Sequence, residues 1–122
     1  MERDSDFYEK VEQITDKDPR YKVAAYAFVM LALNYTLSKL GESRHVTGKE
    51  LLEGIREFAL AQYGPMTKTV FDYWGVHTTR DFGEIVFNLV ENKLLGKTDE
   101  DKIEDFSDVY DFDEEFVKKY PW

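Results

Sequence analysis

Cysteine is absent from this chain of 122 residues, and histidine occurs only twice. Without thiols, neither a disulfide framework nor a thiolate zinc site can form, and a structural metal site has few candidate ligands. Long apolar runs are also scarce. Residues 1–12 are charged from the second position, unlike a signal peptide, and no stretch is expected to span a membrane. These absences favour a cytoplasmic protein without a cofactor.

The composition is that of a folded protein rather than a disordered chain. Hydrophobic residues make up 43% of the sequence, aromatic residues 16% and charged residues 34%, which is enough for both a core and a solvated surface. A chain of this length buries roughly two thirds of the surface that its unfolded form exposes. We therefore expect residues 1–122 to form a single helical domain with one core.

Negative charge is concentrated in one segment. The net charge is −9, and residues 99–115 hold ten acidic side chains against one basic side chain, while the rest of the chain carries fifteen of each sign. A negative surface repels nucleic acid and anionic membranes and attracts basic groups. We expect no nucleic-acid or membrane partner. The segment either is a solvated polar surface or binds a basic protein or metal cations.

Apolar residues recur at helical spacing in five segments of the chain. Thr47 with Glu50, and Thr78 with Asp81, have the spacing of capping boxes, which predicts two helix starts. The predicted fold class is mostly α, a compact bundle of about five helices around a buried central helix. The expected helices are residues 5–16, 19–40, 47–63, 66–74 and 79–92.

The segment 19–40 is the expected central helix. Asp18 and Pro19 have the order of an N-cap and a first-turn proline, and Gly41 is suited to end the helix. Two apolar stripes leave almost no polar side on this segment. A helix that is apolar nearly all round is surrounded by neighbours, so we expect residues 19–40 to be buried on most sides.

The last part of the sequence combines acidic residues with large apolar ones. Residues 94–110 have the pattern of a β-hairpin. Large apolar side chains also lie among the acids of residues 99–122, and a free tail would leave them in water. We expect this segment to be ordered and to wrap the helical body. These side chains are Phe106, Val109, Tyr110, Phe112, Phe116, Tyr120 and Trp122.

Four strings resemble a family of small bacterial hypothetical proteins. They are RHVTGKELLEGIREFALAQYGPM (44–66), VFDYWGV (70–76), DFGEIVFNLVENKLL (81–95) and EDFSDVYDF (104–112). With the run DPRY at 18–21, the resemblance covers nearly the whole chain. It implies a bacterial protein but no activity, cofactor or site residue, so no functional role is carried over from it.

The three helices between residues 47 and 92, followed by a hairpin, are also similar in order to a winged-helix domain. Such domains read DNA with Lys, Arg, Asn or Gln on the third helix, beside a basic surface. Here that helix presents Asp81, Glu84, Asn88 and Glu91, and the hairpin would lie in the most acidic segment. The similarity concerns the fold alone, and DNA binding is not expected.

His45 and His77 are the side chains best suited to acid–base chemistry near neutral pH. Each lies in a loop before a predicted helix cap, where hydrogen bonding that orders the loop explains its presence. If the two loops meet, His45, His77 and Asp81 could hold a metal ion. The Asp-Phe-Gly triplet, the aspartates of residues 99–105 and the isolated serines do not complete a kinase, calcium or nucleophile motif.

The sequence alone therefore assigns no catalytic, cofactor-binding or metal-binding residue. The leading hypothesis is a non-catalytic protein-interaction module that uses the acidic, aromatic-rich segment of residues 99–122. The alternative is a small enzyme or metal-binding protein that uses His45 and His77. The two hypotheses differ in whether the histidines converge in one pocket. Neither the partner nor the oligomeric state follows from the sequence.

Overall fold

A computed structural model of the chain describes residues 2–41, 44–96 and 101–121. Within these ranges the chain has no strand, and the mostly α class predicted from the sequence is confirmed. The α-helices are α1 (Glu2–Lys17), α2 (Val23–Leu40), α3 (Gly48–Tyr63), α4 (Thr67–Trp74) and α5 (Thr79–Glu91). Short helical turns add Gly64–Met66 and Ile103–Phe106, both 3₁₀, and Glu114–Lys118, which is π-helical.

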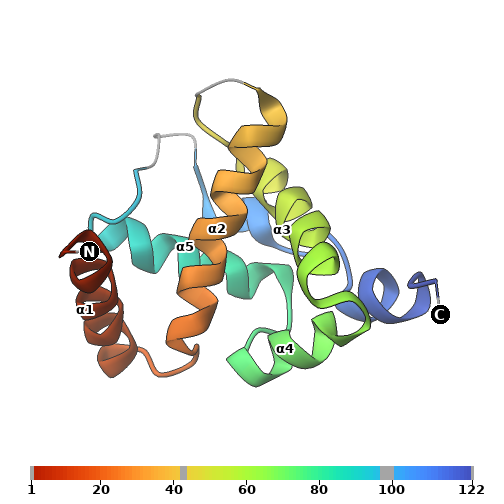
Figure 1. Cartoon of the computed structure of the whole chain (residues 1–122), viewed down its shortest axis with the longest axis horizontal. Helices are drawn as coiled ribbons and strands as arrows, with labels where there is room; N and C mark the ends of the chain where they lie inside the picture. The colour runs from red at the N-terminus through yellow and green to blue at the C-terminus, as the bar shows by residue number, and fades with distance from the viewer. Residues whose placement is uncertain (1, 42–43, 97–100, 122) are drawn as a thin grey trace.

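α2 occupies the middle of the molecule (Figure 1). It lies in front of α5, with α1 on one side and α3 on the other, and it contacts α1, α3, α4 and α5. The turn Ile103–Phe106 packs on α5 and α3, and the π-helical turn Glu114–Lys118 packs on α4. The C-terminal segment therefore runs along the helices instead of away from them.

Two helices begin at the capping boxes that the sequence predicts. The Glu50 amide donates to the Thr47 hydroxyl at 3.2 Å, and the Thr47 amide donates to the Glu50 carboxylate at 3.0 Å. Thr78 and Asp81 are joined in the same way at the start of α5. Each pair satisfies backbone amides that have no acceptor within the helix, so local sequence is sufficient to determine both starts.

The start of α2 differs from the prediction, because the helix begins at Val23 and not at Pro19. The Asp18 carboxylate instead accepts hydrogen bonds from the guanidinium and the backbone amide of Arg20. Arg20 also donates to Glu84 of α5 at 3.0 Å, and Asn88 of α5 donates to Asp18 at 3.1 Å. The Asp-Pro pair thus joins the turn after α1 to α5 instead of capping α2.

Replacing Asp18 with asparagine is expected to lower the free energy of unfolding by about 1 to 2 kcal/mol at pH 7. The hydrogen bonds from Arg20 hold the pKa of Asp18 well below its ordinary value of 3.8. The ionised carboxylate therefore stabilises the fold above that pH, and the contribution is lost as the pH falls toward the lowered pKa. Urea unfolding at pH 7 and pH 2.5 measures this, and the difference from the wild type should shrink at the lower pH. Asp16→Asn, at an exposed position, is the control; an equal loss in both variants would contradict the role given to Asp18.

α2 is buried along one side only. Leu31 on the opposite side is 56% exposed, whereas Leu33 and Leu37 are half-buried. Because apolar residues lie all round the helix, the sequence predicted burial on most sides. The structure differs: part of this apolar surface has no neighbour within the described part of the chain. The buried residues of α2 are Ala25, Tyr26, Phe28, Val29, Ala32 and Thr36.

By length and composition, α2 is also the one helix of the described residues that could cross a membrane, although the sequence was expected to hold no such stretch. Its buried Tyr26 hydroxyl accepts a hydrogen bond from Asn88 of α5 at 3.0 Å. Removing α2 from the bundle would break this bond and open the core. Its place in the core therefore accounts for the apolar residues on the buried side of α2.

The centre of the core is aromatic. Phe71 of α4 contacts four other phenylalanine rings, with centroids 5.1 to 5.7 Å apart. Aromatic pairs at these distances add to the stability that burial provides. Two of the four rings belong to the C-terminal segment, so that segment completes the core. The four are Phe28, Phe82, Phe112 and Phe116, and none is more than 3% exposed.

The hairpin expected over residues 94–110 is not formed by the described residues of that range, and residues 97–100 lie outside the description. The Leu94 amide bonds to the Leu89 carbonyl at 2.9 Å in a turn that follows α5, and Ile103–Phe106 is a 3₁₀ turn. Gly83 explains the difference, because a Cβ there would lie 2.7 Å from the Cβ of Phe106. Because glycine has no Cβ, the turn Ile103–Phe106 can pack directly on α5 instead of pairing as a strand.

Candidate ligand-binding pocket

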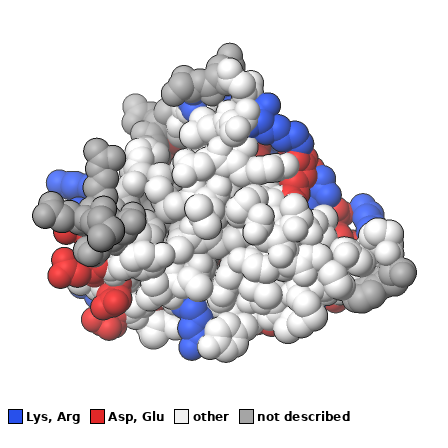
Figure 2. Space-filling view, in the orientation of Figure 1, with Lys and Arg blue, Asp and Glu red and all other residues white. Residues whose placement is uncertain are grey.

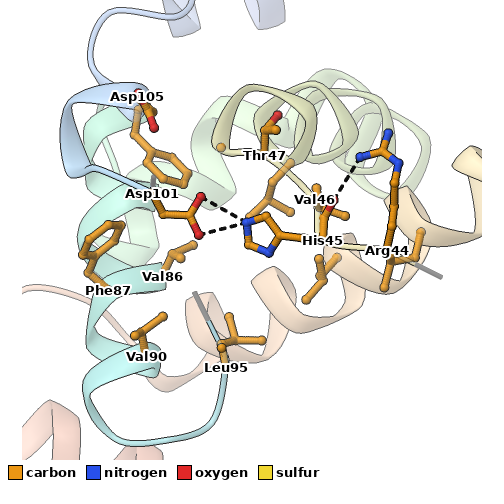
Figure 3. Close-up of a pocket in the computed structure, with 16 residues that line it drawn as sticks. Arg44, His45, Val46, Thr47, Val86, Phe87, Val90, Leu95, Asp101 and Asp105 are labelled. Atoms are coloured by element: carbon orange, nitrogen blue, oxygen red, sulfur yellow. Dashed lines mark hydrogen bonds and ion pairs between the residues drawn. The ribbon is translucent and has the colours of Figure 1, made fainter. Parts of the chain in front are cut away.

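A pocket of about 380 Å³ opens between α2, α3, α5 and the C-terminal segment (Figure 3). Its walls are mostly apolar, and most of them come from half-buried side chains. Pockets of this size and character receive small ligands or the side chains of a partner. The apolar lining consists of Leu33, Leu37, Val46, Leu51, Val86, Phe87, Val90, Leu95 and Phe106.

Helical spacing and two glycines build these walls. Leu33 and Leu37 on α2 are four residues apart, as are Val86 and Val90 on α5, so each pair shares one side of its helix. Phe106 closes the wall between α3 and α5. A Cβ at Gly48 would lie 3.0 Å from its ring, and a Cβ at Gly83 would lie closer still. Glycine on both helices therefore makes room for this ring.

His45 and Asp101 meet at the mouth of the pocket. The His45 Nε2 atom lies 3.0 Å from Asp101 Oδ1 and 2.8 Å from Oδ2. The two side chains approach from opposite sides of the opening (Figure 3), and they are 41% and 19% exposed. This contact joins the loop before α3 to the C-terminal segment and puts a polar pair at the edge of an apolar cavity.

Arg44 points away from this pair (Figure 3). Its guanidinium donates to both carboxylate oxygens of Glu50, at 3.1 and 2.7 Å, and to the His45 carbonyl at 2.9 Å. These hydrogen bonds lower the pKa of Glu50 to about 2. Arg44 thus holds the loop on the first turn of α3 and keeps the His45 backbone in position.

The polar groups of the lining are largely engaged in structural hydrogen bonds. The Thr47 hydroxyl caps α3, and the Asp105 carboxylate accepts a bond from the Lys102 amide at 3.2 Å. Among the described residues that line the pocket there is no serine, cysteine or lysine to act as a nucleophile. The arrangement suits binding of an apolar group, with the carboxylates of Asp101 and Asp105 at the rim, where they already have hydrogen-bond partners.

His77 lies in a different pocket, of about 240 Å³, with Asp108 and Asp111. Its Nδ1 atom is 3.1 Å from Asp72 Oδ1, and its side chain is 63% exposed. The structure therefore does not bring the two histidines into one pocket. In the described ranges, no group of three or more His, Cys, Asp or Glu side chains is arranged to hold a metal ion.

Asp81, the third residue of the hypothetical metal site, has structural partners. It accepts hydrogen bonds from the Tyr21 hydroxyl at 2.6 Å and from the backbone amides of His77 and Thr78 at 2.8 and 3.1 Å. Burial and this bond to Asp81 raise the pKa of Tyr21. The carboxylate therefore caps α5 and fixes Tyr21, which is consistent with the loop-ordering role considered for this region.

Zinc, cobalt or manganese is expected to leave the melting temperature of the protein nearly unchanged. His45 pairs with Asp101 and His77 with Asp72, and the described residues give neither site the three or four protein ligands that tight binding needs. Thermal denaturation with and without micromolar metal measures this. A rise of many degrees that either His45→Ala or His77→Ala abolishes would contradict the expectation and favour a metal-binding protein.

The acidic segment keeps its carboxylates outward and its rings inward. Asp108, Asp111, Asp113 and Glu114 are exposed, whereas Phe106, Phe112 and Phe116 are buried. Some acids pair with bases: Glu115 with Lys119 of the same segment at 2.8 Å, and Asp113 with Lys68 of α4 at 3.8 Å. The surface of this segment is therefore acidic but not aromatic. Asp99, Glu100 and Trp122 lie outside the described residues.

Sequence reasoning identified His45 but missed the pocket beside it. Helical spacing of Leu33, Leu37, Val86 and Val90 predicts core residues and gives no sign that the space between the helices stays open. Asp101 is 56 positions from His45 in the sequence, so no local pattern joins them. The local sequence did contain one signal for this site, the grouping of Arg44, His45 and the Thr47 cap in one short loop.

The functional assignment depends on the geometry of the molecule itself. The resemblance to small bacterial proteins and the similarity to winged-helix domains both stay predictions, and within the described residues the latter lacks its hairpin. His45 and Asp101 at the mouth of an apolar pocket form the best-defined candidate site. No model of a protein family, no curated protein and no solved structure matches this chain.

Proposed function

We propose that the protein is a non-catalytic interaction module whose partner is a protein with a basic segment. An apolar side chain of that segment enters the pocket between α2, α3 and α5. Lysine or arginine residues beside it pair with Asp101, Asp105 and the acids that follow them. The pocket thereby buries the apolar side chain of the partner, and the acidic residues of the C-terminal segment pair with its basic side chains.

The observation that carries this proposal is the combination of an apolar cavity with an acidic rim. The cavity of about 380 Å³ is lined by aliphatic and aromatic side chains, and burial of one large apolar side chain contributes roughly 1.5 to 3 kcal/mol. Asp101 and Asp105 line the same cavity. A ligand with an apolar group next to a cation would satisfy both surfaces.

The extent of the negative charge favours a peptide over a small molecule. Exposed acids continue beyond the pocket at Glu104, Asp108 and Asp111. A ligand confined to the cavity would not reach them, whereas an extended basic chain would. Attraction of this kind raises the rate of association and weakens at high ionic strength.

A small enzyme that uses His45 is the second candidate, supported by the His45–Asp101 pair. A carboxylate bonded to one ring nitrogen orients a histidine for proton transfer. In this alternative, His45→Gln would abolish turnover of a substrate held in the pocket. No such role is supported for His77, whose ring is more exposed and pairs with Asp72.

Selection from a phage library of random dodecapeptides on the immobilised protein tests the proposal. The enriched peptides should combine an aromatic or large aliphatic residue with lysine or arginine. Val86→Phe and Val90→Phe each add volume to the cavity and should weaken peptide binding at least about tenfold. Asp101→Asn should weaken it about fivefold, equivalent to roughly 1 kcal/mol.

Asp16→Asn is the matched control, because it makes the same substitution at an exposed position of α1 that does not line this pocket. It should change peptide affinity less than twofold, and melting curves should show that every variant is folded. Peptides without basic residues, or binding that survives both cavity-filling variants, would contradict the proposal. If the dye Nile red binds the pocket while the library yields no binder, the pocket serves a small molecule and the proposal is wrong.

A further inference from the structure

His45 and Asp101 set the charge at the mouth of the apolar pocket. The His45 Nε2 atom lies 3.0 Å from Asp101 Oδ1 and 2.8 Å from Oδ2, so the ring faces both oxygens of the carboxylate. The two side chains meet across the opening (Figure 3). The His45 side chain is 41% exposed, so its ring can exchange protons with water while the fold stays intact. A cation that approaches Asp101 therefore meets a carboxylate that His45 already occupies.

The charge of this pair depends on the proton of the histidine ring. Histidine is the side chain that ordinarily gains or loses its positive charge between roughly pH 5 and 8. When His45 is protonated, it forms an ion pair that neutralises Asp101. When His45 is neutral, one ring nitrogen can still donate a hydrogen bond, but the carboxylate keeps its whole charge and its other lone pairs. The two states differ by one unit of charge at the mouth.

Two elements bring further charges close to the pair. On the loop before α3, the Arg44 guanidinium points away (Figure 3) and donates to both carboxylate oxygens of Glu50, so these two charges cancel. On the C-terminal segment, Asp105 lines the same pocket and adds a second negative charge. The described residues of the rim therefore carry two negative charges when His45 is neutral and one when it is protonated.

The remaining walls add no charge to the mouth. The side chains with which α2 and α5 line the pocket are all apolar. No charged residue lies between Lys22 and Lys39, and Figure 2 shows the face that α2 crosses to be almost free of charge. Lys49 and Lys102 are exposed and do not line the pocket. Among the described residues of the lining, His45 is the one histidine that faces an acid of the rim.

We propose that His45 is a pH-dependent switch for the binding of a basic segment, and that protonation of its ring weakens this binding. The inference rests on the proposed function, because it concerns the regulation of the same site. A lysine or arginine of the partner competes with the protonated ring for Asp101 and is repelled by its charge. Binding and protonation therefore oppose each other, and a bound cation favours release of the His45 proton by the same factor.

Fluorescence anisotropy at pH 5.5 and pH 8, at constant ionic strength, tests the switch. The probe is a basic dodecapeptide from the phage selection, chosen without histidine or acidic residues and capped at both ends, so that its own charge stays constant. The wild type should bind it about fivefold more tightly at pH 8, the effect expected of one unit charge a few ångströms away in a partly exposed site. His45→Gln keeps a hydrogen-bond donor without a charge, and it should reduce this ratio to below about twofold.

His77→Gln is the matched control, because it makes the same substitution at the other histidine, which pairs with Asp72 and lines a different pocket. It should keep a ratio of more than about threefold, and melting curves at both pH values should show that every variant is folded. Equal affinity of the wild type at both pH values, or a ratio that His45→Gln does not reduce, would overturn the switch and leave the peptide site standing. A selection that yields no basic peptide would overturn both proposals, because no binding would then remain for His45 to regulate.

Discussion

Replacement of Phe28 by alanine is expected to lower the free energy of unfolding by about 3 to 5 kcal/mol. The Phe28 ring is 3% exposed and lies against five aromatic rings, with centroids 5.2 to 6.3 Å away. Those rings come from α3, α4 and α5, so no single helix can shift to fill the cavity. Urea unfolding followed by circular dichroism measures the loss.

Tyr73→Ala is the control for this change, since it also removes an aromatic ring but one that is 72% exposed. Its expected cost is below about 1 kcal/mol. If Phe28→Ala cost as little as the control, α2 would lie at the surface, and the architecture described above would be incorrect.

Removal of residues 111–122 is expected to prevent stable folding. The deletion takes away Phe112 and Phe116, which are 3% and 0% exposed and contact Phe71 and each other. Each lost phenylalanine costs about 3 to 5 kcal/mol, and the sum matches the whole stability of a typical domain. The shortened chain should show a broad, non-cooperative melting curve and poor dispersion in its amide NMR spectrum.

Asp111→Asn and Asp113→Asn provide the comparison, because they remove charge from the same segment and leave the rings in place. Both positions are exposed, and each change should cost less than about 1 kcal/mol. Rapid, unprotected hydrogen exchange at the amides around Phe112 and Phe116 in the intact protein would contradict the docking of this segment.

The helices were predictable where short-range chemistry determines them. Thr47 with Glu50 and Thr78 with Asp81 form their capping boxes within four residues of sequence, and the structure has both. The start of α2 was not predictable in this way. Asp18 is equally able to cap a helix or to bind Arg20, and the bonds of this turn to Glu84 and Asn88 on α5, which the local sequence does not reveal, favour the second arrangement.

The candidate site shows the same limit. His45 was identified because few side chains in this composition titrate near neutral pH, but its contact with Asp101 depends on how the C-terminal segment returns to α3 and α5. The hairpin was predicted from the residue pattern of positions 94–110. In the structure, the turn Ile103–Phe106 within that range packs on α5 instead of pairing with another strand. Gly83 permits that contact, and a glycine within a helical pattern does not by itself reveal which side chain will pack on it.

Because Phe112 and Phe116 complete the core, a chain growing on the ribosome cannot close that core when α5 has just been made. Residues 92–116 must follow first, and at about 5 to 20 residues per second their synthesis takes roughly 1 to 5 s. During this interval Phe71 lacks two of its ring partners, Phe112 and Phe116, and Phe82 lacks one, Phe112. The unfinished protein therefore presents an apolar surface to chaperones and to neighbouring nascent chains, and it buries that surface only when the acidic segment arrives.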